Sequence, residues 1–264
     1  MTGQLPDLPA SVGEVRDVRP LSGGMIAEVW RVSLADGADV VVKAPRYDAR
    51  LEAEGLAALE AAGAPVPAVL AAEEDVLVLE FVSGSPDWAG LGAQLATVHR
   101  TSNASFGWHR DNVIGPLPQS NTRQGDWASF YVENRIRPWL DTLPDGPRAR
   151  LAAACEGPMQ QLLSHEPTPS LVHGDLWSGN VVDGRYLIDP AVHHADREFE
   201  LAFADLFGGI PPSFWSAYEE VWLLPDGWQR RRPALQLYHL LVHVELFGSS
   251  YVPQVVRRLD SLGW

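Results

Sequence analysis

The character of the chain changes near residue 82, and this change constrains the fold more than any other feature of the sequence. Before it, residues 25–34 and 38–43 are runs rich in β-branched side chains, joined through Asp36-Gly37, a pair that favours a tight hairpin turn. Residues 48–62 follow, and their Ala, Leu and Glu content predicts a helix. The first part of the chain is therefore expected to form a small sheet with one helix.

The second part is expected to be mostly helical. A last strand is predicted at residues 76–81, and a turn rich in Ser, Gly and Pro follows at residues 83–86. Beyond this turn, apolar residues recur at helical spacing at Leu91, Leu95 and Val98, and again at Leu237, Leu240, Leu241 and Val244. We predict an α+β protein with two lobes, a small sheet lobe over residues 1–82 and a larger, mostly helical lobe over residues 83–264.

Charge and apolar content exclude two classes of partner. The 264 residues carry 34 acidic against 20 basic side chains, a net charge of −14, whereas nucleic-acid binding requires dense Lys and Arg surfaces. No apolar stretch approaches the roughly 18 residues that span a bilayer, and the N-terminus lacks the pattern of a signal peptide. The one cysteine, Cys155, cannot form an internal disulfide. We therefore expect a cytoplasmic protein without nucleic-acid or membrane partners, and favour a monomer.

The segment with the most specific spacing is residues 171–180, which read LVHGDLWSGN. The spacing His-x-Asp-Leu-x-x-x-Asn is that of the protein-kinase catalytic loop, where the Asp accepts the proton of the substrate hydroxyl and the Asn binds magnesium. Taken singly, Asp175 and Asn180 are equally consistent with loop residues that cap a turn. Taken together, the pattern indicates that Asp175 is the catalytic base, and that His173 forms structural hydrogen bonds.

A second oxygen ligand for magnesium is predicted nine residues after Asn180, at Asp189. Between the two, Asp183-Gly184 favours the tight turn of a hairpin. A hairpin returns the chain to its start, so the side chains of Asn180 and Asp189 are expected to lie side by side. Magnesium is commonly held by one or two such oxygen ligands together with phosphate oxygens.

Lys43 is the one lysine of a chain that has 19 arginines. Lys43 ends a β-branched run. One explanation is that its charge protects an exposed sheet edge from pairing with another strand. The alternative, which the downstream motif favours, is a lysine that contacts the phosphates of ATP and is held by a glutamate of the next helix. Glu52 and Glu54 are the candidates, and they point about 200° apart on a helix, so only one can face the strand. We expect Glu52 to pair with Lys43.

Two further segments are candidates for nucleotide contact. Gly23, Gly24 and Met25 belong to a loop that opens the first predicted strand of this lobe, where they would cover the phosphates. Glu80 and Phe81 lie where backbone groups of a linker could bind adenine, although an ordinary buried strand is equally consistent. The GxxxxGK[ST] and GxGxxG motifs of other nucleotide-binding folds are absent from the sequence.

Together these residues make the chain resemble the fructosamine kinase (ketosamine-3-kinase) family, within the wider aminoglycoside phosphotransferase group. The Leu-Trp-Ser of residues 176–178 is similar to that family's signature, and further matches occur at 106–108, 111–115, 126–127, 189–192, 197–198, 206–209 and 237–241. The resemblance implies a bilobal protein-kinase-like fold, use of ATP and Mg²⁺, and phosphorylation of a sugar hydroxyl of ketoamine adducts. The substrates would be free or protein-bound sugar-amines, as in protein deglycation.

The chain departs from the family pattern just after the predicted metal ligand. It reads His193-His194-Ala195-Asp196 before Arg197-Glu198, so we expect Asp196 and Arg197 to shape the acceptor site. Trp127 is a candidate for stacking on a sugar ring, the alternative being a core residue. The acceptor could instead be an aminoglycoside, a choline-like alcohol or another amino sugar. A catalytically inactive nucleotide-binding module is a third reading, which the presence of every motif residue disfavours.

Overall fold

The computed structural model describes residues 5–21 and 27–264. The N-terminal part forms a five-stranded antiparallel sheet in the order β1-β2-β3-β5-β4. Its strands are β1 (Val15–Pro20), β2 (Glu28–Leu34), β3 (Asp39–Ala44), β4 (Val69–Ala72) and β5 (Leu77–Glu80). The predicted β2–β3 hairpin is confirmed, and Gly37 in its turn has a φ of 93°. Strands β1 and β4 were not predicted, because β1 is an exposed edge rich in charge and β4 has only four residues.

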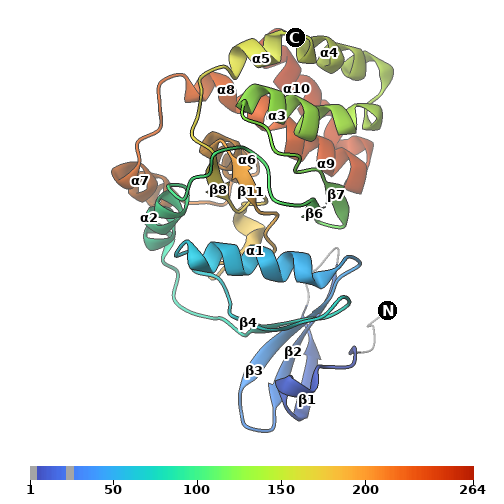
Figure 1. Ribbon diagram of the computed structural model, residues 1–264, viewed down its shortest axis with the longest axis vertical. Coiled ribbons are helices and arrows are strands. Elements are labelled where there is room, and N and C mark those ends of the chain that lie inside the picture. Colours follow the sequence, from blue (N-terminus) through green and yellow to red (C-terminus); the bar gives the residue numbers. More distant parts are fainter. Residues whose placement is uncertain (1–4, 22–26) are drawn as a thin grey trace.

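Helix α1 (Ala49–Ala61) crosses the sheet on the side of the helical lobe (Figure 1). It begins where the Asp48 side chain accepts a hydrogen bond from the Arg50 amide, which satisfies one of the free N–H groups of the first turn. Leu56 of α1 packs on Leu77 and Leu79 of β5, whereas the alternate residues of β5 face a second core on the other side of the sheet. Because Val41 packs on the α1 side, Lys43 faces α1 as well.

The remainder of the chain is mostly helical, as predicted. Its α-helices are α2 (Trp88–Val98), α3 (Trp127–Tyr131), α4 (Asp145–Cys155), α5 (Pro158–Leu162), α6 (Arg197–Leu206), α7 (Pro212–Val221), α8 (Trp228–Leu235), α9 (Leu237–Phe247) and α10 (Val252–Leu262). They surround one large core, which includes Leu91, Leu95, Leu237 and Leu241 of the predicted apolar patterns. Where α2 packs on α7, a Cβ at Gly92 would lie 2.2 Å from the carbonyl oxygen of Phe214, so only glycine allows this close approach.

Short helices and strands connect these elements. The 3-10 helices are η1 (Ala10–Val12), η3 (Arg137–Thr142), η4 (Ser178–Asn180) and η5 (Ser249–Tyr251), and η2 (Val132–Ile136) is a π-helix. Three antiparallel pairs join β6 (Asn112–Ile114) to β7 (Leu117–Gln119), β8 (Ser170–Val172) to β11 (His193–Ala195), and β9 (Val181–Val182) to β10 (Tyr186–Leu187). The β8–β11 and β9–β10 pairs flank the segment with the kinase-like spacing.

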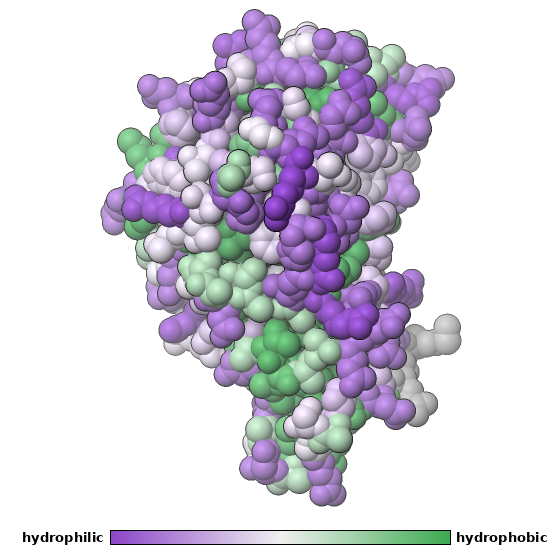
Figure 2. All heavy atoms as spheres, in the orientation of Figure 1, coloured by the Kyte–Doolittle hydropathy of each residue, from purple (hydrophilic) through white to green (hydrophobic). Residues whose placement is uncertain are grey.

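The arrangement is bilobal, with the sheet lobe at one end of the molecule and the helices at the other (Figure 1). Strand β5 ends at Glu80 and α2 begins at Trp88, so the predicted boundary at residues 82 and 83 falls in the connecting segment and stays a prediction. In the view of Figure 2, hydrophobic side chains gather over the sheet lobe, where Leu70 of β4 is 50% exposed, and hydrophilic ones cover much of the helical lobe. Within residues 5–21 and 27–264, no helix is long and apolar enough to cross a membrane.

Candidate active site

The loop after β8 is tied by its backbone to the segment after β10. Gly174 has a φ of 85°, and a Cβ on it would lie 2.1 Å from the carbonyl oxygen of Ala191. The imidazole of His173 donates from Nε2 to the carbonyl of Ile188 (2.9 Å) and accepts the amide N–H of Asp175 at Nδ1 (3.2 Å). Burial lowers the pKa of His173, which favours the neutral ring that these two bonds require. This geometry agrees with a structural role for His173.

Glu200 of the helical lobe holds the same loop and is itself held by His99; neither residue was identified from the sequence. Glu200 of α6 accepts the amide N–H of Gly174 (2.8 Å), and its other oxygen is 2.6 Å from Nε2 of His99. Both side chains are buried, and Glu200 is 1% exposed. A buried carboxylate is stable only with such partners. The sequence carries no spacing signal for these contacts, since the residues involved are far apart in the chain.

Asn180 and Asp175 are directly bonded. The Nδ2 amide of Asn180 donates to the backbone oxygen and to Oδ2 of Asp175, both at 2.9 Å. Both hydrogens of the amide are thereby used, so the Oδ1 atom of Asn180 is left to bind a cation. Removal from water raises the pKa of Asp175 well above its usual value, and the nearby Asp189 carboxylate acts in the same direction.

The predicted hairpin between Asn180 and Asp189 is confirmed. Asp183 and Gly184 have φ values of 51° and 62°, and the amide of Arg185 donates to the carbonyl of Val182 at 3.0 Å. Positive φ at both central positions is the signature of the hairpin turn that Asp-Gly favours. The chain returns so that the amide of Ile188 donates to the carbonyl of Asn180 (3.1 Å), which places Asp189 beside the start of the hairpin.

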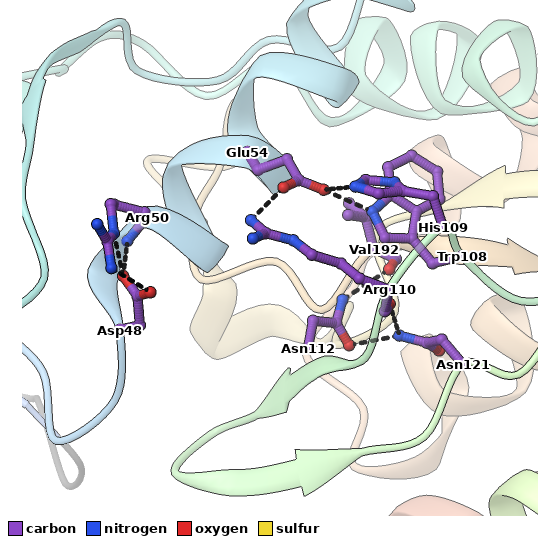
Figure 3. Close-up of polar contacts among 9 residues, drawn as sticks. All are labelled: Asp48, Arg50, Glu54, Trp108, His109, Arg110, Asn112, Asn121 and Val192. Atoms are coloured by element: carbon purple, nitrogen blue, oxygen red, sulfur yellow. Dashed lines mark hydrogen bonds and ion pairs between the residues drawn. The ribbon is translucent and has the colours of Figure 1, made fainter.

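Lys43 contacts one carboxylate from each lobe. Its Nζ lies 2.6 Å from Oε1 of Glu52 on α1, and it also forms an ion pair with Oδ1 of Asp189. The other oxygen of Glu52 accepts the Tyr47 hydroxyl at 2.7 Å. Burial acts to lower the pKa of Lys43, but the two carboxylates outweigh it and raise the pKa above the usual value, so the ammonium stays charged. Glu54 points elsewhere and contacts the helical lobe (Figure 3).

One cavity of about 450 Å³ is lined by residues of both lobes. Lys43, Asp175, Asn180 and Asp189 form its polar wall. The side chain of Asp189 is 45% exposed, which leaves it accessible to a ligand. A second part of the lining, here called the aromatic wall, consists of Phe207, His243, Phe247 and Tyr251. Residues 113–115, at the tip of the β6–β7 hairpin, also line the cavity.

The donor set of the polar wall fits a hard divalent cation. The Oδ1 atom of Asn180 and the carboxylate of Asp189 are oxygen ligands, which Mg²⁺ prefers, and the cavity beside them leaves space for phosphate oxygens. Among the described residues, a second group of potential ligand atoms occurs at His165, Asp196 and Glu198, within 4.8 Å of one another. There, however, the guanidinium of Arg231 already neutralises Glu198 through two bonds of 2.6 and 2.7 Å.

The proposed role of Trp127 in sugar stacking is wrong. Its side chain is 2% exposed and packs in the core of the helical lobe, with ring centroids 5.2 Å from Phe106 and 5.5 Å from Tyr131. The reason is local: Asp126 caps the start of α3, and the first residue of the helix then points into the core. Trp127 is therefore a core residue, as the alternative interpretation of the sequence expected.

Asp196 and Arg197, which were expected to shape the acceptor site, do not line the cavity of Asp175. Asp196 caps α6 through the amide of Glu198 (3.0 Å) and contacts Nε2 of His165 (2.8 Å). Arg197 donates to the backbone carbonyls of Trp222 (2.9 Å) and Leu223 (2.6 Å). Both line a different cavity from that of Asp175, because β11 carries the chain away from Asp189 along β8 before α6 begins.

The remaining nucleotide contacts stay predictions. Gly23, Gly24 and Met25 lie outside the described residues. Glu80 donates its amide to the carbonyl of Ala68 at 2.9 Å, and the ring of Phe81 lies 4.0 Å from the guanidinium carbon of Arg31. Neither Glu80 nor Phe81 is among the described residues that line the cavity.

Comparison with known proteins gives three consistent findings. The model of the family described as "Fructosamine kinase" matches residues 3–262. A relative from Thermus thermophilus, named "Probable ketoamine kinase", is 36% identical over 253 residues, which cover 92% of each chain. The crystal structure of a protein from Thermobifida fusca, named as a fructosamine-3-kinase, superposes with a TM-score of 0.87 at 37% identity and covers 96% of this chain and 95% of its own.

A more distant structure defines the fold class. The ternary complex of streptomycin, ATP and the phosphotransferase APH(2")-IIa has a TM-score of 0.62 at 15% identity, covering 93% of this chain and 91% of that one. At this identity the likeness shows the fold alone. The bilobal protein-kinase-like architecture expected from the sequence is therefore confirmed.

Proposed function

This chain belongs to the fructosamine kinase family, and on that premise we propose that it transfers the γ-phosphoryl group of ATP to a sugar hydroxyl of a ketoamine, free or protein-bound. It is an ATP-dependent kinase. The observation that supports the proposal most strongly is the convergence of Lys43, Asp175, Asn180 and Asp189 on one cavity. These residues come from both lobes, and together they supply a base, oxygen ligands and a phosphate-binding cation.

Asp175 acts as the base in this proposal. Asn180 holds Oδ2 of the carboxylate at 2.9 Å, which leaves Oδ1 for the acceptor hydroxyl. The hydroxyl proton moves to Asp175 as the sugar oxygen attacks the γ-phosphorus, and the bond from that phosphorus to the β-γ bridging oxygen breaks, releasing ADP. Positioning and charge stabilisation are the main contributions of the protein to such a transfer.

Asn180 and Asp189 would hold Mg²⁺, and Lys43 would contact phosphate oxygens. The bound metal supplies neutralisation of the phosphate charge. Glu52 keeps the ammonium of Lys43 at the edge of the cavity through the 2.6 Å ion pair. The ion pair between Lys43 and Asp189 supports this assignment, because it brings the ammonium next to the proposed metal ligand, as phosphates bound to both would require.

The Asp189→Asn substitution tests the metal assignment. Losing the carboxylate should raise the Mg²⁺ concentration needed for half-maximal activity about 10- to 100-fold, the range expected when a hydrogen bond or contact to a charged group is lost. The measurement is a Mg²⁺ titration of ATP turnover at saturating ATP. Asp183→Asn, at the exposed tip of the same hairpin, is the matched control and should leave the titration unchanged. An unchanged midpoint for Asp189→Asn would remove Asp189 from the metal site.

The aromatic wall supports a sugar-amine acceptor. The ring centroids of His243 lie 4.9 Å from Phe207, 5.4 Å from Phe247 and 5.0 Å from Tyr251. The Nδ1–H of His243 donates to the carbonyl of His239 (2.7 Å), and burial lowers the pKa of His243, so a neutral ring offers the lone pair of Nε2. Aromatic faces and such an acceptor atom favour an ammonium group and sugar C–H surfaces.

A panel of acceptors tests the proposed function. We expect ATP consumption with fructosyl-lysine or ribulosyl-lysine, and a phosphate on the sugar in the product. Aminoglycosides and choline should give turnover at least about tenfold lower at equal concentration, a difference of about 1.4 kcal/mol in transition-state binding. Coupled measurement of ADP release, followed by phosphorus NMR of the product, checks both points. Turnover confined to aminoglycosides or choline would overturn the ketoamine assignment.

A further inference from the structure

Two glutamates on opposite faces of helix α1 contact different lobes. Glu52 contacts Lys43 in the sheet lobe, and Glu54 contacts residues 108–110 in the helical lobe. We propose that Glu54 is a positioning residue, which anchors α1 to residues 108–110 so that Glu52 is held against Lys43. This inference rests on the proposed function, because it assigns Lys43 and Glu52 to nucleotide binding.

Three consecutive side chains converge on the Glu54 carboxylate (Figure 3). The indole Nε1 of Trp108 donates to Oε1 at 2.7 Å, and Nε2 of His109 lies 3.2 Å from the same oxygen. Arg110 forms an ion pair with Oε2. The Glu54 side chain is 29% exposed, so these contacts are partly shielded from water. A surface ion pair alone contributes little, but a carboxylate held by several donors has a defined position.

The same turn of α1 packs on the segment that carries Asp189. A Cβ at Gly55 would lie 3.1 Å from Cγ of Pro190 and 3.3 Å from Cγ2 of Val192, so the helix backbone approaches this segment closely. The indole of Trp108 also stacks on His194, with ring centroids 5.3 Å apart and an interplanar angle of 28°. Glu54 therefore fastens α1 at the point where it meets the predicted metal-binding segment.

The segment that follows residues 108–110 is held by further hydrogen bonds. Directly after it, Asn112 donates from Nδ2 to the carbonyl of Val192 (2.8 Å) and accepts at Oδ1 from Asn121 (2.7 Å) and Gln119 (2.8 Å). The Asn112 contacts are seen beside the Glu54 contacts in Figure 3. Residues 113–115, at the tip of the hairpin that Asn112 begins, line the cavity. Glu54 thus connects the helix that orients Lys43 to the hairpin that borders the acceptor space.

The geometry of the helix explains how Glu54 acts on Glu52. Residues two apart on an α-helix point about 200° from one another, so a rotation that releases Glu54 from residues 108–110 turns Glu52 relative to β3. The ammonium of Lys43 would then lose its fixed position against Glu52. Binding of ATP should weaken, and its phosphates should be less well placed for transfer.

The test is Glu54→Gln, which keeps the size of the side chain and removes the charge that Arg110 needs. We expect the Kd for a fluorescent ATP analogue to rise about tenfold and kcat/KM for ATP to fall similarly, the loss expected for one charge-assisted contact. Glu60→Gln, on the exposed last turn of the same helix, is the matched control and should change neither value. A wild-type Kd in Glu54→Gln would overturn the proposal.

A second measurement separates positioning from a general loss of structure. If Glu54 acts through Glu52, the Glu54→Gln substitution should change ATP affinity less than about twofold in a Glu52→Gln background, since coupled residues are not additive. A full tenfold effect in that background would overturn the proposal. The ATP affinity is measured without any acceptor. If the wild-type protein did not phosphorylate ketoamines, that result would therefore contradict the proposed function and leave the role of Glu54 to be decided by the ATP affinities.

Discussion

Replacing Asp175 with asparagine should lower kcat about 10²- to 10⁴-fold, the typical contribution of a general base. Asparagine has nearly the same shape, and its Oδ1 can accept the bond that Asn180 now donates to Asp175 at 2.9 Å. Its Nδ2 would then face the acceptor, and an amide nitrogen cannot take the hydroxyl proton. The loss should therefore arise from the chemical step and not from a rearranged loop.

The affinity for ATP distinguishes this loss from unfolding. Lys43, Glu52 and Asp189 are untouched, so the Kd for ATP of Asp175→Asn should stay within about threefold of wild type, less than the loss of one neutral hydrogen bond produces. Single-turnover kinetics with a ketoamine acceptor, together with ATP binding by fluorescence, check both expectations. Turnover near the wild-type rate would show that Asp175 is not the base.

Replacing Lys43 with arginine should lower kcat/KM for ATP about 10²-fold or more, the cost of misplacing reacting groups by about 1 Å. The charge is kept, but the side chain is 7% exposed and confined between Glu52 and Asp189. A planar guanidinium is larger than an ammonium and orients its donors as a fork. It would either displace the two carboxylates or project into the space that the phosphates need.

An arginine-to-lysine substitution at another position provides a control for the Lys43→Arg prediction. Arg50→Lys changes an exposed cation of α1, which pairs with Asp48, and should leave kcat/KM for ATP unchanged. Thermal melting of both variants checks the fold, and a melting temperature of Lys43→Arg close to wild type would assign its loss to the site. If Lys43→Arg kept most of its activity, the compact ammonium would not be required there.

Local spacing predicted the part of the candidate site that lies between His173 and Asp189. The loop, the Asp-Gly turn and the returning strand are close in sequence, and backbone preferences alone bring Asn180 and Asp189 together. The choice of Glu52 over Glu54 as the contact of Lys43 also agrees with the structure, because helical periodicity limited the alternatives to two. Both expectations needed only geometry over short distances along the chain.

Longer-range packing explains the residues that were placed wrongly. Trp127, Asp196 and Arg197 each stand next to a residue or motif that resembles the family, but the direction of their side chains depends on elements far away in sequence. The Trp127 ring packs in the core against Phe106 and Tyr131. The carbonyls of Trp222 and Leu223 hold Arg197. Neither contact has a periodic signal in the sequence.

The sequence by itself determined the fold class and the kinase-like spacing, and it drew attention to a lone lysine among 19 arginines, because turns, helical periods and motif spacing are local properties. Only the tertiary structure decided which charges share the cavity and which side chains are buried in the core. It also revealed that Glu54 joins α1 to residues 108–110 of the other lobe. Such contacts depend on how whole elements pack, since a side chain is oriented by the sum of its burial, its partners and the position of its helix.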